Sequence, residues 1–456
     1  MKNYILNPTP ENLFDAYQND IIGRNDELHK FIDYLNIVDD SQIVALDGAW
    51  GCGKTFFVKQ TKMIMDAYNS FIKKDDDYFA KVREIGNKKR YSLNEKVKPQ
   101  VTVYYDAWEN DNDDDPIMSI VYSILQDVDC DYKFKANDSI LEKAMAVLDV
   151  FSGRSFSNLY DKCKSKDFLE ALRESRDIKH LVDDFLESLL PEKGDRLIVI
   201  IDELDRCKPD YAVKTLERIK HYFSNDRITF IISVNLAELQ HTIKKCYGSD
   251  FDACRYLERF FDLTVTLAPP DYKNYYLSIG CDNSTYVFDS MCKHVADTLN
   301  LSLRERGKFL MQARIAAYKP THSGNSWALS DEDLGVEYAY LYILPVMIGL
   351  RMSDLSKYNR FILGEEEVFF ADTFLRINDR DFKTLLNSDE AYEDSKTDQK
   401  KTISKHDKYL ELYRSIFSTE GTNGKKRIGK YVFSKYTKDE LLRTISLLSK
   451  NASFEM

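Results

Sequence analysis

The chain has 456 residues and a mass of 53.2 kDa, more than one hydrophobic core usually serves, so we expect two or three domains. Hydrophobic residues at 43% and charged residues at 30% are typical of folded domains. A formal net charge of -11 argues against a protein that coats nucleic acid through bulk charge. The basic clusters at residues 88–90 and 425–427 leave a local phosphate contact open, beside the interpretation as solvated loop charge.

The eight cysteines are scattered without a C-x-x-C pair, and no apolar N-terminal signal segment precedes them, which predicts reduced thiols in the cytoplasm. The longest apolar run, residues 338–350, is shorter than the roughly 20 residues of a membrane span and contains Pro345. We interpret this run as a buried helix, and we expect a cytoplasmic protein that makes no contact with a membrane.

The first motif is a glycine-rich loop that matches the phosphate-loop pattern G-x-x-x-x-G-K-[ST]. The apolar run at residues 42–46 predicts a buried strand before it, and residues 54–68 predict a helix after it. Glycines let backbone N–H groups surround an anion, and the helix adds the positive end of its dipole. We expect Lys54 to reach the β- and γ-phosphates and Thr55 to ligate magnesium. The predicted nucleotide contacts of the loop are Gly48, Trp50, Gly51, Cys52, Gly53, Lys54, Thr55 and Phe56.

The second motif is an apolar strand that ends in acids, RLIVIIDELDRC at residues 196–207. Residues 197–201 form the predicted strand, Asp202 is the expected magnesium-side acid, and Glu203 is placed to orient or deprotonate the attacking water. A catalytic carboxylate beside the magnesium acid suits a hydrolase better than a kinase. The alternative is a buried strand that ends in a solvated acidic turn.

Two further strands are predicted around this acid strand. Residues 101–108 predict a strand between the two motifs. The acid strand is then not the next strand in the sequence after the phosphate-loop strand, and this topology is typical of ATPases that have an added strand and a catalytic glutamate. Pro209 opens a helix, and residues 227–235 then predict another buried strand. Asn235 at its end is a candidate sensor of the γ-phosphate or its water, or it caps the next helix, since one side chain can serve either role.

Taken in order, these blocks resemble the KAP P-loop NTPases over roughly residues 20–270. GAWGCGKTFF resembles the phosphate loop of the family, and YYDAWEND is similar to its Asn-Ala-Trp block, with Asp106 at the Asn position. DELDRCKPDYAVKTLERIKHYF resembles its extended acid motif, and SVNLAELQHTI with YLERFFDLTVTLAPP resembles its sensor strand and closing block. Two residues depart from the common pattern, because Cys52 replaces a serine and Arg259 a lysine. The thiol of Cys52 suggests redox sensitivity, or it is only a small residue that fits.

The resemblance implies an α/β fold with a P-loop NTPase core and a doubly wound, mainly parallel sheet at residues 1–270. A helical insertion at about residues 111–195 replaces the membrane spans that many members carry there. Residues 271–456 are expected to form a mainly helical C-terminal domain for partner binding or specificity. The resemblance also implies that Gly23 and Arg24 border the base, although an ordinary glycine turn before a helix explains them equally.

For function, the resemblance implies ATP and Mg²⁺ as ligands and a hydrolase that acts as a switch or motor in bacterial anti-phage defence or phage exclusion. Self-association and a protein partner from the same system are expected. Arg206, Arg255 and Arg259 are candidates for a cation that stabilises the transferred phosphoryl group, in cis or from a neighbouring subunit, and Arg259 is favoured. Surface salt bridges are the alternative for each arginine. The rival functions are an ATP-gated scaffold with slow turnover and a nucleic-acid-stimulated ATPase.

Overall fold

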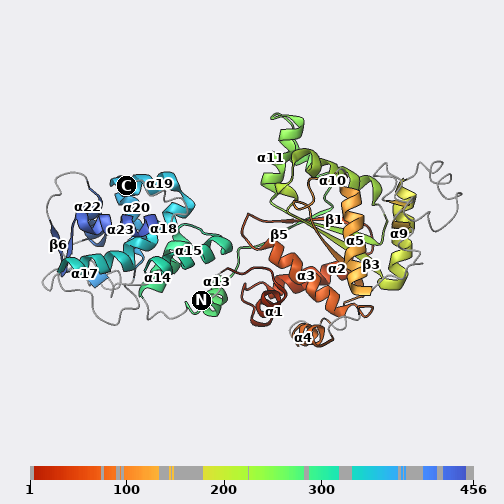
Figure 1. Ribbon diagram of the computed structural model, residues 1–456, viewed down its shortest axis with the longest axis horizontal. Coiled ribbons are helices and arrows are strands. Elements are labelled where there is room, and N and C mark those ends of the chain that lie inside the picture. Colours follow the sequence, from red (N-terminus) through yellow and green to blue (C-terminus); the bar gives the residue numbers. More distant parts are fainter. Residues whose placement is uncertain are drawn as a thin grey trace. The chain divides into compact units, whose positions relative to one another are not determined.

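The chain divides into an N-terminal unit, Asn7–Tyr275, and a C-terminal unit, Tyr276–Met456 with Met1–Leu6. The computed structural model describes residues 5–72, 76–88, 93, 97–113, 115–132, 143–144, 146–147, 178–223, 225–281, 287–317, 331–377, 382–383, 385–386, 404–418 and 425–447. Figure 1 shows the helices and strands and labels those for which there is room.

The N-terminal unit is built on one parallel sheet. Its strands lie in the order β2-β3-β4-β1-β5, and every neighbouring pair is parallel. The strands are β1 (Gln42–Asp47), β2 (Gln100–Asp106), β3 (Arg196–Asp202), β4 (Ile228–Val234) and β5 (Leu263–Thr266). Strands β3 and β4 are buried along their whole length, as their continuous apolar sequences require, whereas β5 alternates in exposure because it is an edge strand.

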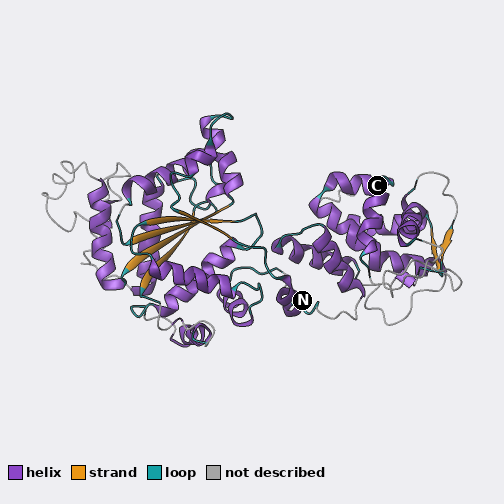
Figure 2. Ribbon diagram, turned by 180° about the vertical axis from the view of Figure 1, so that it is seen from behind, coloured by secondary structure: helices purple, strands orange, loops and turns teal. Residues whose placement is uncertain are grey.

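Helices cover both faces of this sheet, which Figure 2 shows in purple around the orange strands. The helix α3 packs against β2 and β4, and α1, α2 and α4 pack around α3. On the opposite face, side chains of α5, α9, α10, α11 and α12 share one hydrophobic core with four of the strands. The bounds are α1 (Pro10–Asn19), α2 (Asn25–Ile37), α3 (Lys54–Tyr68), α4 (Asp76–Gly86), α5 (Pro116–Tyr132), α9 (Ile178–Lys193), α10 (Pro209–Tyr222), α11 (Leu236–Tyr247) and α12 (Ala253–Leu257).

The sheet confirms the predicted fold class, a P-loop type α/β core with helices on both faces. Strand β4 lies between β1 and β3, so the acid-bearing strand is separated from the phosphate-loop strand by one strand. Of the helical insertion predicted at residues 111–195, the structure describes α5 and α9, and most of 133–177 lies outside the described residues. Helix α9 buries one apolar stripe, Val182, Phe185, Leu186 and Leu189.

The described residues of the C-terminal unit are mainly helical, with one short antiparallel pair of strands that the sequence did not predict. Helix α13 (Tyr272–Ser278) crosses the division between the two units. The other elements are α14 (Val287–Thr298), α15 (Leu303–Ala316), α17 (Asp331–Tyr338), the π-helical η3 (Ala339–Ile343), α18 (Leu344–Ser353), α19 (Leu355–Leu363), α20 (Glu367–Leu375), α22 (Lys405–Phe417), β6 (Lys426–Ile428), β7 (Tyr431–Phe433) and α23 (Lys435–Leu447).

The apolar run predicted as a buried helix lies in this unit. Within the described part of the chain, the continuous helical stretch Asp331–Ser353 is long and apolar enough to cross a membrane by length and composition. Its most apolar window is 78% buried inside the structure, and α14, α15 and α19 pack against its second half. Burial to this degree is typical of the core helix of a soluble protein.

The basic cluster at residues 425–427 is neutralised by acidic neighbours. Each of its three side chains has an ion-pair partner from another element, in the pairs Lys425–Glu332, Lys426–Glu411 and Arg427–Asp331. Such exposed pairs contribute little to stability, but they satisfy charge that would otherwise attract phosphate. The observation favours the interpretation of this cluster as surface charge. In the other basic cluster, residues 89–90 lie outside the described residues.

Candidate nucleotide site

The glycine-rich loop connects the end of β1 to the start of α3, with α3 beginning at Lys54. Gly51 and Gly53 have φ angles of 78° and 98°, in the left-handed region that favours glycine. Gly48 is required for a different reason, because a Cβ atom on it would lie 2.7 Å from the sulfur of Cys52. The three glycines therefore give the loop a tight curve that presents backbone groups in front of α3, as a phosphate cradle requires.

The ammonium group of Lys54 is held by the loop itself. Its Nζ donates to the carbonyl oxygen of Gly48 at 2.5 Å and to that of Ala49 at 3.4 Å, and the residue is only 9% exposed. A buried ammonium needs such acceptors, and phosphate oxygens can take their place. Thr55 follows as a partly buried residue in the first turn of α3, and the side chain of Phe56 is buried. For Phe56, only the backbone can face a nucleotide.

The carboxylate of Asp202 ends β3 and is held by two donors. The hydroxyl of Tyr104 donates to its Oδ2 at 3.0 Å, and the backbone N–H of Glu203 donates to its Oδ1 at 3.1 Å. The residue is 1% exposed, so these bonds fix its orientation in a site with little water. A carboxylate and the Thr55 hydroxyl are the hard oxygen ligands that Mg²⁺ prefers, so the donor set fits a magnesium ion.

Glu203 follows in a strained turn and is paired with a cation. Its φ angle is 63°, in the left-handed region that non-glycine residues rarely adopt. Arg206 Nη1 contacts Glu203 Oε2 across the 3-10 turn η2 (Leu204–Arg206). Burial raises the pKa of the Glu203 carboxyl, Arg206 opposes this shift, and the charges of Asp202 and Asp106 add to it. A carboxyl with a raised pKa is suited to accept a proton near neutral pH.

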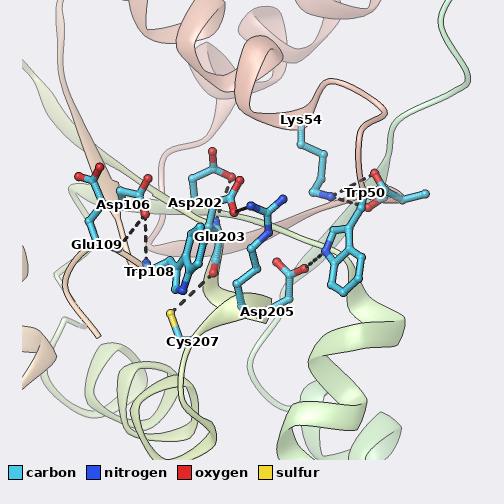
Figure 3. A network of polar contacts seen from close by, with 12 residues as sticks. Trp50, Lys54, Asp106, Trp108, Glu109, Asp202, Glu203, Asp205 and Cys207 are labelled. Atoms are coloured by element: carbon cyan, nitrogen blue, oxygen red, sulfur yellow. Dashed lines mark hydrogen bonds and ion pairs between the residues drawn. The ribbon is translucent and has the colours of Figure 1, made fainter. Parts of the chain in front are cut away.

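Two loops border these acids, as Figure 3 shows. On one side, Asp106 at the end of β2 pairs in register with Asp202, and its Oδ1 accepts the backbone N–H groups of Trp108 and Glu109, both at 3.1 Å. Burial raises the pKa of the Asp106 carboxyl. On the other side, Trp50 Nε1 donates to Asp205 Oδ2 at 2.6 Å. The pairing of β2 with β3 thus brings the Asp-Ala-Trp block beside the acid motif, and the bond from Trp50 to Asp205 joins the phosphate loop to it.

Asn235 lies at the end of β4 and caps the next helix. Its Oδ1 accepts the backbone N–H of Ala237 at 3.2 Å as the N-cap of α11. The γ-phosphate role predicted for the same side chain stays a prediction. The sequence analysis missed Ser233 of β4, which lies in register between Asp202 and Leu46. Its buried hydroxyl has no hydrogen bond to the described residues, and a hydroxyl near the end of an apolar strand was the signal that could have identified it.

The segment before α2 contacts the phosphate loop through Arg24. This residue is buried, its Nη1 donates to the carbonyl oxygen of Cys52 at 2.9 Å, and its Nη2 contacts the carbonyl oxygen of Ala268 beyond β5. Gly23 has a φ angle of 69° and lies against Asp271, where a Cβ atom would approach the Asp271 Cβ to 2.5 Å. Arg24 therefore stabilises the phosphate loop through the backbone of Cys52. A contact of Gly23 or Arg24 with the base stays a prediction.

Arg259 is the arginine that the sequence analysis favoured as the cation for the transferred phosphoryl group. Arg259 lies just after α12 with an exposed side chain, and its guanidinium has no hydrogen bond or ion pair to the part of the chain that the structure describes. Arg255 of α12 is exposed as well. Arg206 is the one of the three candidates that contacts a predicted catalytic residue.

The curved loop at the start of α3 and the acids on β3, separated by β4, are the features of a P-loop nucleoside triphosphatase domain. Residues 24–279, more than half of the chain, match the KAP family P-loop domain, and the chain belongs to this family. The resemblance found in the motifs is therefore confirmed, and membership supports binding and hydrolysis of nucleotides. No protein of established function matches the chain in the comparison with curated proteins.

Proposed function

We propose that the chain is a magnesium-dependent ATP hydrolase whose turnover drives a conformational switch. The observation that carries the proposal is the placement of Glu203 directly after the buried Asp202, the last residue of β3. Strand β4 separates β3 from the phosphate-loop strand β1. A second carboxylate at that position has a pKa raised by burial and can take a proton from water. A protein that only bound nucleotide would not need it.

Each residue of the site has a separate part in the proposed reaction. The loop from Gly51 to Thr55 binds the phosphates through its backbone, and Lys54 exchanges its carbonyl partners for β- and γ-phosphate oxygens. Thr55 and Asp202 would hold Mg²⁺, which neutralises phosphate charge when bound. Glu203 orients the attacking water and accepts its proton. Asn235 is proposed to contact the γ-phosphate or this water in addition to capping α11.

The decisive experiment measures binding and turnover of ATP and GTP, with magnesium, for the wild type, Glu203→Gln and Lys54→Ala. We expect ATP turnover in the wild type, its loss in Glu203→Gln with binding retained, and the loss of binding in Lys54→Ala. Tight binding without turnover in the wild type would favour the ATP-gated scaffold instead. Faster turnover with added DNA or RNA, abolished by salt, would favour the nucleic-acid-stimulated enzyme.

Assembly and biological role extend the proposal beyond the site. Arg259 is exposed, so it can serve the site of a neighbouring copy. Two results together would support this role: that the chain self-associates in the presence of ATP, and that Arg259→Ala lowers ATP turnover without weakening ATP binding. A cytoplasmic role in bacterial anti-phage defence with a protein partner rests on the family resemblance alone. Its test compares phage growth in cells that produce the wild type or Lys54→Ala; equal growth would contradict it.

A further inference from the structure

The guanidinium of Arg206 lies between two groups of the site that differ in charge. It forms an ion pair with Glu203, and its Cζ lies 5.5 Å from the ring centroid of Trp108. The Arg206 side chain is 25% exposed and that of Glu203 13%. A cation on the face of an aromatic ring stays stabilised when its anionic partner changes. Arg206 can therefore leave Glu203 without losing all of its contacts.

We propose that Arg206 is a phosphate-binding residue that exchanges Glu203 for the γ-phosphate of the bound nucleotide, so that Glu203 is released as the base only when a γ-phosphate is present. The inference rests on the proposed hydrolase function and assigns its regulation to one ion pair. It concerns Arg206, which acts within its own chain, and it is separate from the role proposed for Arg259 at the site of a neighbouring copy.

The exchange is favoured by charge and geometry. A γ-phosphate carries more negative charge than one carboxylate and offers oxygens to the planar fork of a guanidinium. Arg206 ends the short turn η2, which directly follows Asp202 and Glu203, so it lies beside the residues proposed to act on the γ-phosphate. Arg24, by contrast, is bound to two backbone carbonyls. Of these two arginines, Arg206 is therefore the one placed for this exchange.

Loss of the ion pair frees the carboxylate of Glu203 to contact the attacking water. When the guanidinium moves to the phosphate, Oε2 of Glu203 loses the cation that it contacts, so this oxygen is free to accept a hydrogen bond from the attacking water. The attacking water then gives one proton to Glu203 while its oxygen bonds to the γ-phosphorus and the bond from that phosphorus to the bridging oxygen breaks, which leaves ADP and phosphate.

The turn that carries Arg206 is also tied to the phosphate loop. Asp205, its neighbour in η2, accepts the indole N–H of Trp50. A movement of the loop on phosphate binding is therefore transmitted to the turn by a hydrogen bond. This connection gives the exchange a second input, from the β-phosphate end of the site.

The test compares equilibrium binding of the β,γ-imido analogue of ATP and of ADP, both with Mg²⁺, by titration calorimetry on the full chain. For Arg206→Ala we expect the affinity for the analogue to fall at least tenfold and that for ADP to change less than twofold. For Glu203→Gln we expect tighter binding of the analogue, because the competing carboxylate is gone, with ADP unchanged. In the double variant this gain should disappear, since it depends on Arg206.

An unchanged ratio of the two affinities in Arg206→Ala would overturn the inference. An equal loss for both ligands is one such result, and a merely structural role of Arg206 would produce it. Arg206→Lys retains the charge without the fork, is the alternative if the alanine variant does not fold, and should weaken only the analogue. Arg443→Ala is the matched control, because Arg443 forms an i,i+3 pair with Glu440 in the C-terminal unit and should leave both affinities unchanged. A wild type that bound neither ligand would instead contradict the proposed function itself.

Discussion

The indole N–H of Trp50 donates a hydrogen bond to Asp205 Oδ2 over 2.6 Å and thereby joins the phosphate loop to the turn after the acid strand. Trp50 is 48% exposed, so its ring does not owe its position to burial alone. The sequence analysis assigned Trp50 to the nucleotide contacts of the loop. The structure adds that it links the two halves of the site.

Replacing Trp50 with Phe should lower kcat/KM for ATP by about tenfold. Phenylalanine keeps an aromatic ring but loses the donor, and a hydrogen bond to a charged group contributes about 1.5–3 kcal/mol when buried and less when half exposed. Steady-state hydrolysis measures the loss. In a double-mutant cycle with Asp205→Ala, the two losses should not add; full additivity would show that the bond does not couple the loop to the turn.

Replacing Gly48 with Ala should weaken nucleotide binding more than tenfold. The added methyl group would lie 2.7 Å from the sulfur of Cys52, so the loop must shift to accept it. Cys52→Ala in the same chain removes that sulfur and should restore part of the affinity. Calorimetric titration with ADP and Mg²⁺ measures both variants, and the absence of any restoration would exclude the thiol as the obstacle.

Replacing Tyr104 with Phe should raise the Mg²⁺ concentration needed for half-maximal turnover, by about tenfold. Burial raises the pKa of the Tyr104 hydroxyl, which therefore keeps its proton and donates to Asp202. Partners that orient a metal ligand typically contribute 10–100-fold to metal affinity, by order of magnitude. Tyr105→Phe is the matched control on the same strand, because its hydroxyl contacts Tyr211 and not an acid of the site. A similar magnesium shift in both variants would contradict the assignment.

The acid limb of the hydrolysis rate should lie above the ordinary glutamate pKa of 4.5. Burial raises the pKa of Glu203, and the carboxylate is the form that accepts a proton, so activity is lost as the pH falls through the raised value. Asp106→Asn removes one like charge but keeps an oxygen for the two backbone donors. The limb should therefore move to lower pH in single-turnover measurements, and an unmoved limb would show that Glu203 does not control it.

Replacing Asn235 with Ala should cost about 1 kcal/mol of unfolding free energy, because α11 loses its N-cap. Asn235→Ser retains a capping oxygen and should be nearly as stable as the wild type. If the amide also contacts the γ-phosphate or its water, the serine variant loses turnover while it keeps its stability. Denaturant unfolding and hydrolysis separate the two roles, and full turnover in Asn235→Ser would leave the side chain as a cap alone.

The elements of the nucleotide site were predictable where local chemistry governs them. The strand before the loop and the helix from Lys54 to Tyr68 followed from an apolar run, the glycines and a near-helical apolar spacing. Strands β3 and β4 followed from continuous buried sequences. These features depend on residues close together in the chain, so the pattern is visible without the fold.

Contacts between distant segments were decided by the tertiary structure. The pairing of β2 with β3 brings Tyr104 against Asp202, and the fold places Arg24 against the carbonyl of Cys52. The acidic partners of the basic cluster at residues 425–427 come from other helices in the same way. No local periodicity encodes such neighbours, because strand order and helix packing depend on the whole core. The sequence by itself therefore determined the family and the elements that carry the loop and the acids, whereas the tertiary structure decided which side chains hold and orient them.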